Sequence, residues 1–186
     1  MTGPAARLRR TTRETRVEVS VRLHARGRLD WEHPDGFLVH LLGAFARYSG
    51  TDIRLRTRGD DPHHVAEDSA LALGRALRRA IPERGIARFG EATVPMDEVL
   101  VQVVLDLVDR PYYRADLPAD NLGEHLLRSL VLEAPFSLHQ RTIRPGEAHH
   151  LLEATFKAFG LAFDRATAPA ARELSTKGQV AWEELR

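Results

Sequence analysis

Cysteine is absent from the 186-residue chain, and lysine occurs only at Lys157 and Lys177. Without cysteine, disulfide frameworks and thiolate metal sites are excluded, so a bound metal would have to be held by imidazole and carboxylate groups. No apolar run approaches the roughly 18 residues that a membrane-spanning helix needs. The start of the chain also lacks the apolar middle of a signal peptide. We therefore expect a cytoplasmic protein that does not bind membranes.

An excess of either charge is also missing. The chain has 27 basic and 26 acidic residues, with a formal net charge of +1. The overall charge therefore gives no reason to expect nucleic-acid binding. Hydrophobic residues make up 43% and charged residues 28%, which is typical of a folded protein with a sizeable core. The length allows one ordinary domain or two small ones.

The first half of the chain mixes strand and helix patterns. Residues 16–23 alternate polar and apolar side chains, which predicts a half-buried strand, and residues 27–33 are expected to be its hairpin partner. Apolar spacing predicts helices over residues 36–50 and 63–81. Residues 51–59 alternate again and predict a strand between the two helices.

The second half repeats this order. It predicts strands over 97–108 and 135–144 and helices over 121–134 and 149–166. The segment HLLGAFARYSGTDIRLRTRGDDPHH also aligns with HLLRSLVLEAPFSLHQRTIRPGEAHH at both ends, with a one-residue gap. Duplication of a strand–helix–strand–helix unit explains both findings, and we predict an α+β fold.

We expect the two pseudo-repeats to form one compact subunit. The predicted bounds are 7–90 for the first repeat, 91–168 for the second, and 169–186 for a C-terminal tail.

Two adjacent histidines occur twice, in the strings HHVAED and HHLLEA, each with a glutamate four positions after the first histidine. Positions i and i+4 share one face of a helix, so His63 points with Glu67 and His149 points with Glu153. The second histidine of each pair is turned about 100° away. One such pair is ordinary surface polarity, whereas duplication with the glutamate retained favours metal binding.

His64 and His150 would then serve a different ion from their neighbours, unless the helix start is distorted. His40, in an otherwise apolar helix, and His139, in the strand before the second pair, are further candidate ligands. Imidazole and carboxylate ligands suit Mn, Fe, Zn, Co or Ni. The other histidines are expected on the surface: His24, His33 and His125.

Several motifs, in this order and spacing, resemble the imidazoleglycerol-phosphate dehydratase family over nearly the whole chain. They are TRET (residues 12–15), FLVHLL (37–42), HHVAED, ARFGEATVPMDE (87–98), LDLVDRPY (105–112), HHLLEATFKAFG and STKG (175–178). The resemblance implies a fold of the ribosomal-protein-S5-domain-2-like type. It also implies a homo-oligomer of 24 subunits, with two Mn²⁺ ions per active site at subunit boundaries.

The resemblance also assigns site residues by position. The implied metal ligands are His40, His63, His64, Glu67, His139, His149, His150 and Glu153. The implied groups that bind the small phosphate substrate are Glu14, His40, Arg88, Arg110, Ser175, Thr176 and Lys177. Cationic groups and hydroxyls are good donors to a phosphate, which gives the rare lysine a physical role.

The implied activity is that of a hydro-lyase of histidine biosynthesis, converting D-erythro-imidazole glycerol phosphate to imidazole acetol phosphate. The reaction removes a hydroxyl beside the imidazole and a non-acidic proton from the next carbon. Two metals on the ring would favour imidazolate, which could expel hydroxide and give a diazafulvene-like intermediate. A carboxylate would then move the acidified proton. Glu14 is the first candidate, and Glu67 or Glu153 could assist.

The sequence departs from the family pattern at several positions. Val39 and Tyr48 stand where the family usually has Asp and His, and the loop before His63 is shorter. Glu147 or Ala148 stands where Asn is usual. Losing groups that orient metal ligands commonly costs about 10–100-fold in metal affinity or activity.

Three functions therefore stay open: the dehydratase, a divergent paralogue acting on another imidazole-containing phosphate, and a metal-stapled assembly without catalysis. The presence of all eight ligands together with the phosphate-binding set disfavours the last, because an assembly has no need for Lys177.

Overall fold

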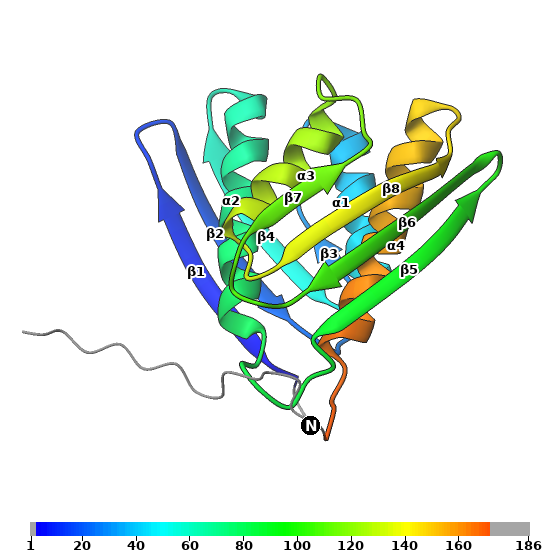
Figure 1. The fold of residues 1–186 in the computed structure, drawn as a ribbon. Helices are drawn as coiled ribbons and strands as arrows, with labels where there is room; N and C mark the ends of the chain where they lie inside the picture. Colours follow the sequence, from blue (N-terminus) through cyan, green and yellow to red (C-terminus); the bar gives the residue numbers. More distant parts are fainter. Residues whose placement is uncertain (1–2, 172–186) are drawn as a thin grey trace, which may run out of the picture.

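A computed structural model describes residues 3–171, so the predicted tail residues Ser175, Thr176 and Lys177 lie outside the described part. Within these residues the chain forms two four-stranded sheets and four helices (Figure 1). The strands are β1 (Ala5–Thr11), β2 (Thr15–Arg22), β3 (Leu29–Asp30), β4 (Asp52–Gly59), β5 (Phe89–Met96), β6 (Val99–Asp106), β7 (Tyr112–Ala115) and β8 (Ser137–Arg144). The helices are α1 (Gly36–Tyr48), α2 (Pro62–Ala80), α3 (Leu122–Glu133) and α4 (Ala148–Thr167).

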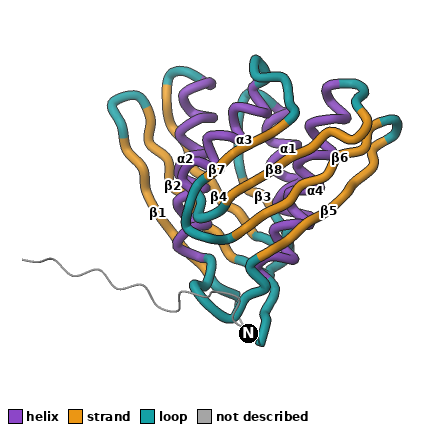
Figure 2. Tube along the Cα trace, in the orientation of Figure 1, coloured by secondary structure: helices purple, strands orange, loops and turns teal. Residues whose placement is uncertain are grey.

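The two sheets have the same topology. Their strand orders are β1-β2-β4-β3 and β5-β6-β8-β7, so each unit places its strands in the same way. In each sheet the first three strands pair antiparallel and the last pair is parallel. The predicted α+β fold of two duplicated units is therefore confirmed. The four helices lie between the sheets (Figure 2), and none of those described is long and apolar enough to cross a membrane.

The prediction that residues 27–33 form a hairpin with β2 is wrong. The antiparallel partner of β2 is β1, and β3 pairs parallel with β4. The backbone N–H groups of Arg26 and Arg28 donate to Oδ1 of Asp52, at 3.2 and 3.0 Å. These bonds tie the segment to the start of β4, which draws the next strand alongside β4 instead of β2.

The sequence reading also missed β5, which forms the edge of the second sheet beside β6. Its pattern is interrupted by Gly90 and Pro95. Proline is tolerated on an edge strand because its missing N–H need not enter the ladder. Asp97, at φ 47°, makes the tight turn into β6. A residue with positive φ is common in such two-residue hairpins.

Helices from different units pack against each other. α2 covers the first sheet and α4 covers the second, while α1 packs on α4 and α3 packs on α2. Phe45 of α1 stacks on Phe159 of α4, with ring centroids 4.4 Å apart, and both rings are fully buried. The hydrophobic core is therefore continuous across the duplicated units.

Two glycines allow these helix pairs to approach closely. Gly74 of α2 and Gly160 of α4 each lie eleven residues after the first histidine of their pair. A Cβ on Gly74 would overlap the carbonyl oxygen of Leu130 in α3, and a Cβ on Gly160 would lie 2.9 Å from the carbonyl oxygen of Phe45 in α1. Only glycine permits backbone contact at both crossings.

We predict that Gly74→Ala destabilises the fold by about 1–3 kcal/mol, because the methyl group has no space beside the backbone of α3. The matched control is Gly43→Ala in α1, where a new Cβ meets only Cδ2 of Leu29, at 3.9 Å. That change should stabilise by about 0.5–1 kcal/mol, as expected for alanine in a helix. Denaturant unfolding midpoints measure both. Equal effects of the two substitutions would contradict the close crossing.

Candidate metal and active site

Acidic residues cap both helices that begin with paired histidines. Asp61 accepts a hydrogen bond from the backbone N–H of His63 at 2.7 Å, and Glu147 accepts one from the backbone N–H of His150 at 3.1 Å. The bond from His63 lowers the pKa of Asp61. Such caps fix where a helix begins. Pro62, beside the cap, occupies a first-turn position that suits proline.

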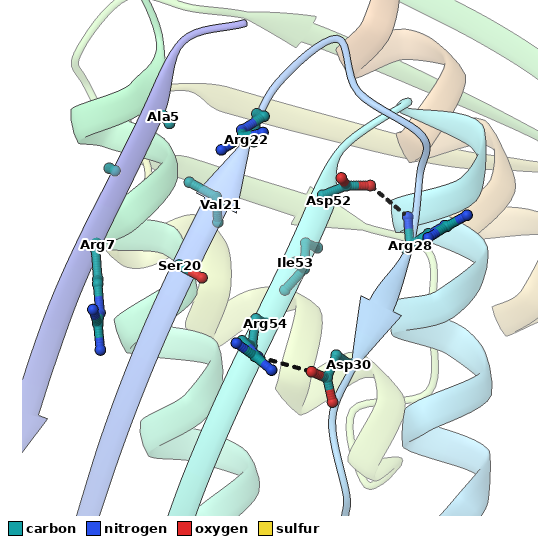
Figure 3. Close-up of a pocket in the computed structure, with 11 residues that line it drawn as sticks. Ala5, Arg7, Ser20, Val21, Arg22, Arg28, Asp30, Asp52, Ile53 and Arg54 are labelled. Atoms are coloured by element: carbon teal, nitrogen blue, oxygen red, sulfur yellow. Dashed lines mark hydrogen bonds and ion pairs between the residues drawn. The ribbon is translucent and has the colours of Figure 1, made fainter. Parts of the chain in front are cut away.

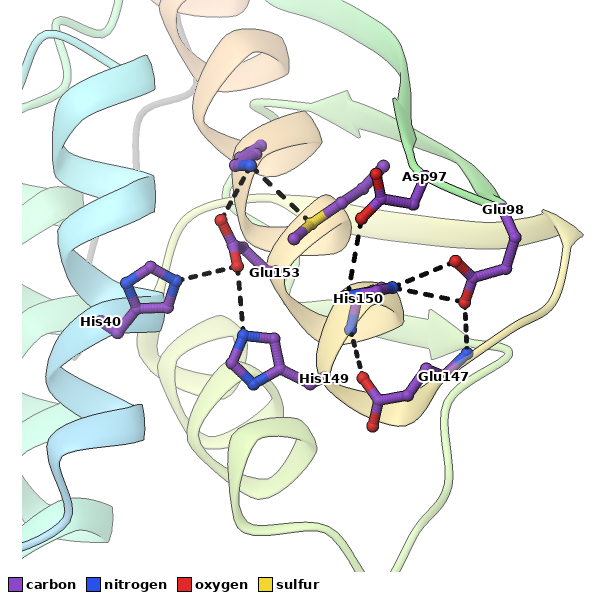
Figure 4. Close-up of polar contacts among 9 residues, drawn as sticks. His40, Asp97, Glu98, Glu147, His149, His150 and Glu153 are labelled. Carbon is purple, nitrogen blue, oxygen red and sulfur yellow. Dashed lines mark hydrogen bonds and ion pairs between the residues drawn. The ribbon is translucent and has the colours of Figure 1, made fainter.

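The first group of candidate ligands is His40 of α1 with His149 and Glu153 of α4; we call it the α1–α4 cluster (Figure 4). Oε2 of Glu153 lies 2.9 Å from Nε2 of His40 and 3.3 Å from Nε2 of His149. The expected sharing of one helix face by His149 and Glu153 is therefore observed. His40 joins them from the neighbouring helix.

Glu153 is held as a carboxylate. Burial opposes its charge, but the Lys157 ammonium and His40 overcome this and lower the pKa of Glu153 to about 2. Nζ of Lys157 lies 2.8 Å from Oε1, so the lysine occupies one oxygen and the two imidazoles face the other. The carboxylate is thus ionised and shared between a cation and two potential metal ligands.

The second group is His63 and Glu67 of α2 with His125 of α3; we call it the α2–α3 cluster. Nε2 of His125 lies 3.9 Å from Oε1 of Glu67, and its ring stacks on His63 with centroids 5.0 Å apart. The expectation that His125 is an unrelated surface residue is wrong, because α3 packs on α2. In the sequence alignment of residues 40–64 with residues 125–150, His125 stands opposite His40.

The remaining predicted ligands lie elsewhere in the described chain. Nδ1 of His64 is 3.5 Å from Oε2 of Glu14, and His139, on an exposed part of β8, stacks on Tyr112 at 5.2 Å. Within residues 3–171, neither histidine joins a group of three potential ligands. The eight predicted ligands are thus not brought together within one chain.

His150 faces the turn between β5 and β6. Glu98 accepts from the backbone N–H of Glu147 at 2.7 Å and from Nδ1 of His150 at 3.1 Å (Figure 4). The bond from Glu147 is the largest cause that lowers the pKa of Glu98 to about 2, and Glu98 in turn raises the pKa of His150. With Asp97, these residues form a third potential ligand group. The sequence reading gave the turn no such role.

Asp68, the last residue of HHVAED, fixes the loop that carries Glu14. Its buried carboxylate accepts from Nε of Arg10 at 2.8 Å and from the hydroxyl of Thr15. The hydroxyl of Thr12 in turn accepts from the backbone N–H of Glu14 at 3.2 Å. Sequence reasoning missed Asp68, although its place directly after Glu67 on the same helix was a signal.

The predicted phosphate-binding arginines differ in their surroundings. Arg88 makes a bidentate ion pair with Asp106, at 2.7 and 3.1 Å, which raises the pKa of the guanidinium. Its φ of 70° is unusual for a residue other than glycine and marks local strain. Arg110 is exposed, and its backbone carbonyl accepts from the hydroxyl of Ser137 at 3.3 Å. Arg88 is therefore fixed in place, and Arg110 is open to solvent.

A hollow of about 610 Å³ on the first sheet lies apart from these residues (Figure 3). Charged side chains of both signs line it, including Arg28, Asp30 and Arg54, but none of the predicted site residues does. Asp30 pairs with Nε of Arg54 at 2.8 Å. Because it contains none of the predicted site residues and Asp30 is already paired with Arg54, the hollow is a weaker candidate site than the two His/Glu clusters.

We predict that Asp68→Asn destabilises the protein by about 1–3 kcal/mol, because Arg10 loses a charged partner beside the helix. Asp60→Asn is the matched control, since Asp60 is exposed in the loop before α2. It should change stability by less than about 0.5 kcal/mol. Unfolding midpoints measure the difference, and equal losses in the two variants would refute the anchoring role.

Comparisons with known proteins agree on one family. The sequence model of imidazoleglycerol-phosphate dehydratase matches residues 33–163. The imidazoleglycerol-phosphate dehydratase of Nocardioides sp. is 42% identical over 198 residues, covering 94% of this chain and 98% of that protein. The chloroplastic imidazoleglycerol-phosphate dehydratase 1 of Arabidopsis thaliana is 41% identical, covering 89% and 66% respectively.

A solved structure agrees with these sequences. The crystal structure of the Pyrococcus furiosus enzyme in complex with (S)-C348 is similar to this chain, with a TM-score of 0.81 and 36% identity. It covers 93% of this chain and 100% of its own. The matched sequence includes every residue of both His/Glu clusters. The chain therefore belongs to the imidazoleglycerol-phosphate dehydratase family, which are hydro-lyases of histidine biosynthesis.

Proposed function

We propose that this chain dehydrates D-erythro-imidazole glycerol phosphate to imidazole acetol phosphate at a site with two Mn²⁺ ions. The observation that carries this proposal is the pair of His/Glu clusters at duplicated positions. Each cluster offers two imidazoles and one carboxylate, with ligand atoms within 4.8 Å of one another. This donor set suits Mn²⁺, which accepts imidazole and carboxylate ligands. The low pKa of Glu153 favours the same assignment.

Each cluster leaves coordination positions free, because three protein ligands do not complete an octahedral ion. His64, His139 and His150 belong to neither cluster and would complete the sites of neighbouring copies. This arrangement requires a homo-oligomer, for which family resemblance suggests 24 subunits. Sites at chain boundaries also explain why one chain does not gather all eight predicted ligands.

Bound Mn²⁺ would supply Lewis acidity at the two ring nitrogens of the substrate. His40, which faces the α1–α4 cluster, would also contact the ring and help to orient it. Loss of water, as hydroxide from the carbon beside the ring and a proton from a ring nitrogen, would make the neighbouring C–H of the substrate acidic. Glu14 is the proposed group to take the proton of that C–H, because its carboxylate is exposed on an anchored loop. Glu67 and Glu153 would assist from their clusters.

Cationic and hydroxyl groups would hold the substrate phosphate. Arg88 is positioned in advance by Asp106, and Arg110 offers an exposed guanidinium. Ser175, Thr176 and Lys177 complete the proposed set, outside the described residues. A fixed guanidinium loses less side-chain entropy when an anion binds.

A divergent paralogue remains the second candidate, favoured by Val39 and Tyr48. Val39 packs against the core, and Tyr48 is 40% exposed where α1 meets α4. Tyrosine cannot carry a proton near neutral pH as histidine does. Such a paralogue would bind Mn²⁺ yet leave imidazole glycerol phosphate unchanged.

We expect the purified Mn²⁺-loaded protein to release imidazole acetol phosphate from imidazole glycerol phosphate. Chelation should abolish turnover and added Mn²⁺ should restore it, because the metal is the Lewis acid of the proposed site. Product formation is followed by mass spectrometry and metal content by elemental analysis. Two bound ions per subunit without turnover would favour the paralogue or the non-catalytic assembly.

We predict that Glu14→Gln lowers kcat by about 10²–10⁴-fold, as for loss of a general acid–base group, and leaves Mn²⁺ content unchanged. The glutamine keeps the size of the side chain but cannot exchange protons. Glu83→Gln is the control, an exposed residue beyond the C-terminal end of α2. Steady-state kinetics with metal analysis tests both. Full activity of Glu14→Gln would remove Glu14 from the mechanism.

A further inference from the structure

We propose that Glu98 is a positioning residue, which orients the His150 ring so that its Nε2 is available to a metal ion. The site residues implied by family resemblance do not include Glu98. The inference rests on the proposed function, because it takes His150 as a metal ligand. It follows from the duplicated architecture, the hydrogen bonds of Glu98 and the space left for it by Gly146.

Glu98 is the counterpart of Glu14 in the other unit. Glu14 directly precedes β2 and Glu98 directly precedes β6, and these are the second strands of the two units. Oε2 of Glu14 lies 3.5 Å from Nδ1 of His64, the second histidine of the first pair. Oε2 of Glu98 lies 3.1 Å from Nδ1 of His150, the second histidine of the other pair. The duplication therefore repeats a contact between a turn glutamate and a histidine nitrogen.

The two glutamates differ in how firmly they are held. Oε1 of Glu98 accepts from the backbone N–H of Glu147 at 2.7 Å, and both of its oxygens lie within 3.3 Å of Nδ1 of His150 (Figure 4). The carboxylate of Glu98 also packs against Gly146, where an added Cβ would overlap it. Glu98 is thus fixed by two donors and a close backbone contact.

The first unit gives Glu14 a different setting. Asp60 stands three residues before His63, as Gly146 stands three residues before His149, so the space that Glu98 fills is not repeated. The contact of Glu14 with its histidine is longer, and its side chain is 61% exposed against 47% for Glu98. Of the two related carboxylates, one is therefore suited to moving protons and the other to holding a ring in place.

The bond from Nδ1 determines which nitrogen of His150 can bind a metal. A carboxylate only accepts hydrogen bonds, so Nδ1 carries the proton and the neutral ring has its lone pair on Nε2. Oδ2 of Asp97 lies 3.6 Å from Nε2, beyond hydrogen-bond range, and its side chain is 72% exposed. Metal-bound histidines almost always donate their other ring N–H in this way.

The orientation matters because His150 belongs to neither His/Glu cluster of its own chain. In the proposed assembly it would reach an ion held by a neighbouring copy. A ring that is fixed before the copies meet loses less side-chain entropy when the metal binds.

Nitrogen NMR of the histidine rings in metal-free protein tests the contact, at an alkaline pH where the rings are neutral. We expect His150 to carry its proton on Nδ1, and His150→Gln identifies its signals. Glu98→Ala should move the proton to Nε2, which free histidine favours. Glu98→Gln should keep it on Nδ1, because the amide oxygen still accepts.

Calorimetry of Mn²⁺ binding tests the consequence. Glu98→Ala should weaken one of the two Mn²⁺ affinities about 10–100-fold, and Glu98→Gln should recover most of that loss. Glu91→Ala is the matched control, an exposed glutamate of β5 in the same hairpin, and should change neither affinity nor tautomer. Thermal unfolding of the metal-free variants verifies that they fold.

An unchanged tautomer in Glu98→Ala, or unchanged affinity for both ions, would overturn the inference. Equal losses of affinity in Glu98→Ala and Glu98→Gln would also overturn it, because the negative charge and not the orientation of the ring would then explain the effect. If the unmodified protein binds two ions and Glu98→Ala binds them identically, only this inference fails. If the unmodified protein binds no Mn²⁺, the proposed function fails first.

Discussion

The close crossing of helices from different units is the constraint on which both clusters depend. α1 must reach α4, and α3 must reach α2, before any histidine of one unit can face a glutamate of the other. Glycine at the same position of α2 and α4 lets the backbones approach where a methyl group would not fit. The packing of the core therefore also determines where the ligands lie, because a shift within either helix pair would separate the residues of a cluster.

The chain also fixes its charged groups in advance. Capping bonds at Asp61 and Glu147 set the first turns of α2 and α4, and Asp68 ties the loop carrying Glu14 to α2. Arg88 is held by Asp106. Each interaction holds a group that the proposed chemistry needs ionised or oriented. Such preorganisation lowers the cost of orienting these groups during a reaction.

The sequence predicted the regular elements well and the contacts between them poorly. All four helices end within two residues of the predicted bounds, because their periodicity is strong. The edge strand β5 was missed because Gly90 and Pro95 interrupt its alternation. His125 lies beside Glu67 because α3 packs on α2, and local periodicity does not encode packing between helices. The internal alignment held that information, since it pairs His125 with His40.

The two clusters share a donor set but differ in strength. The side chain of Glu153 is 11% exposed and that of Glu67 is 41% exposed, so attraction to a cation is less screened at Glu153. Lys157 offsets this advantage, because its ammonium already occupies one oxygen of Glu153. In the α2–α3 cluster the competition comes instead from Arg128, through the histidine ring. Duplication thus supplied the same ligands twice, and the second unit places a different cation in each cluster: Lys157 beside the glutamate of one, and Arg128 beside a histidine of the other.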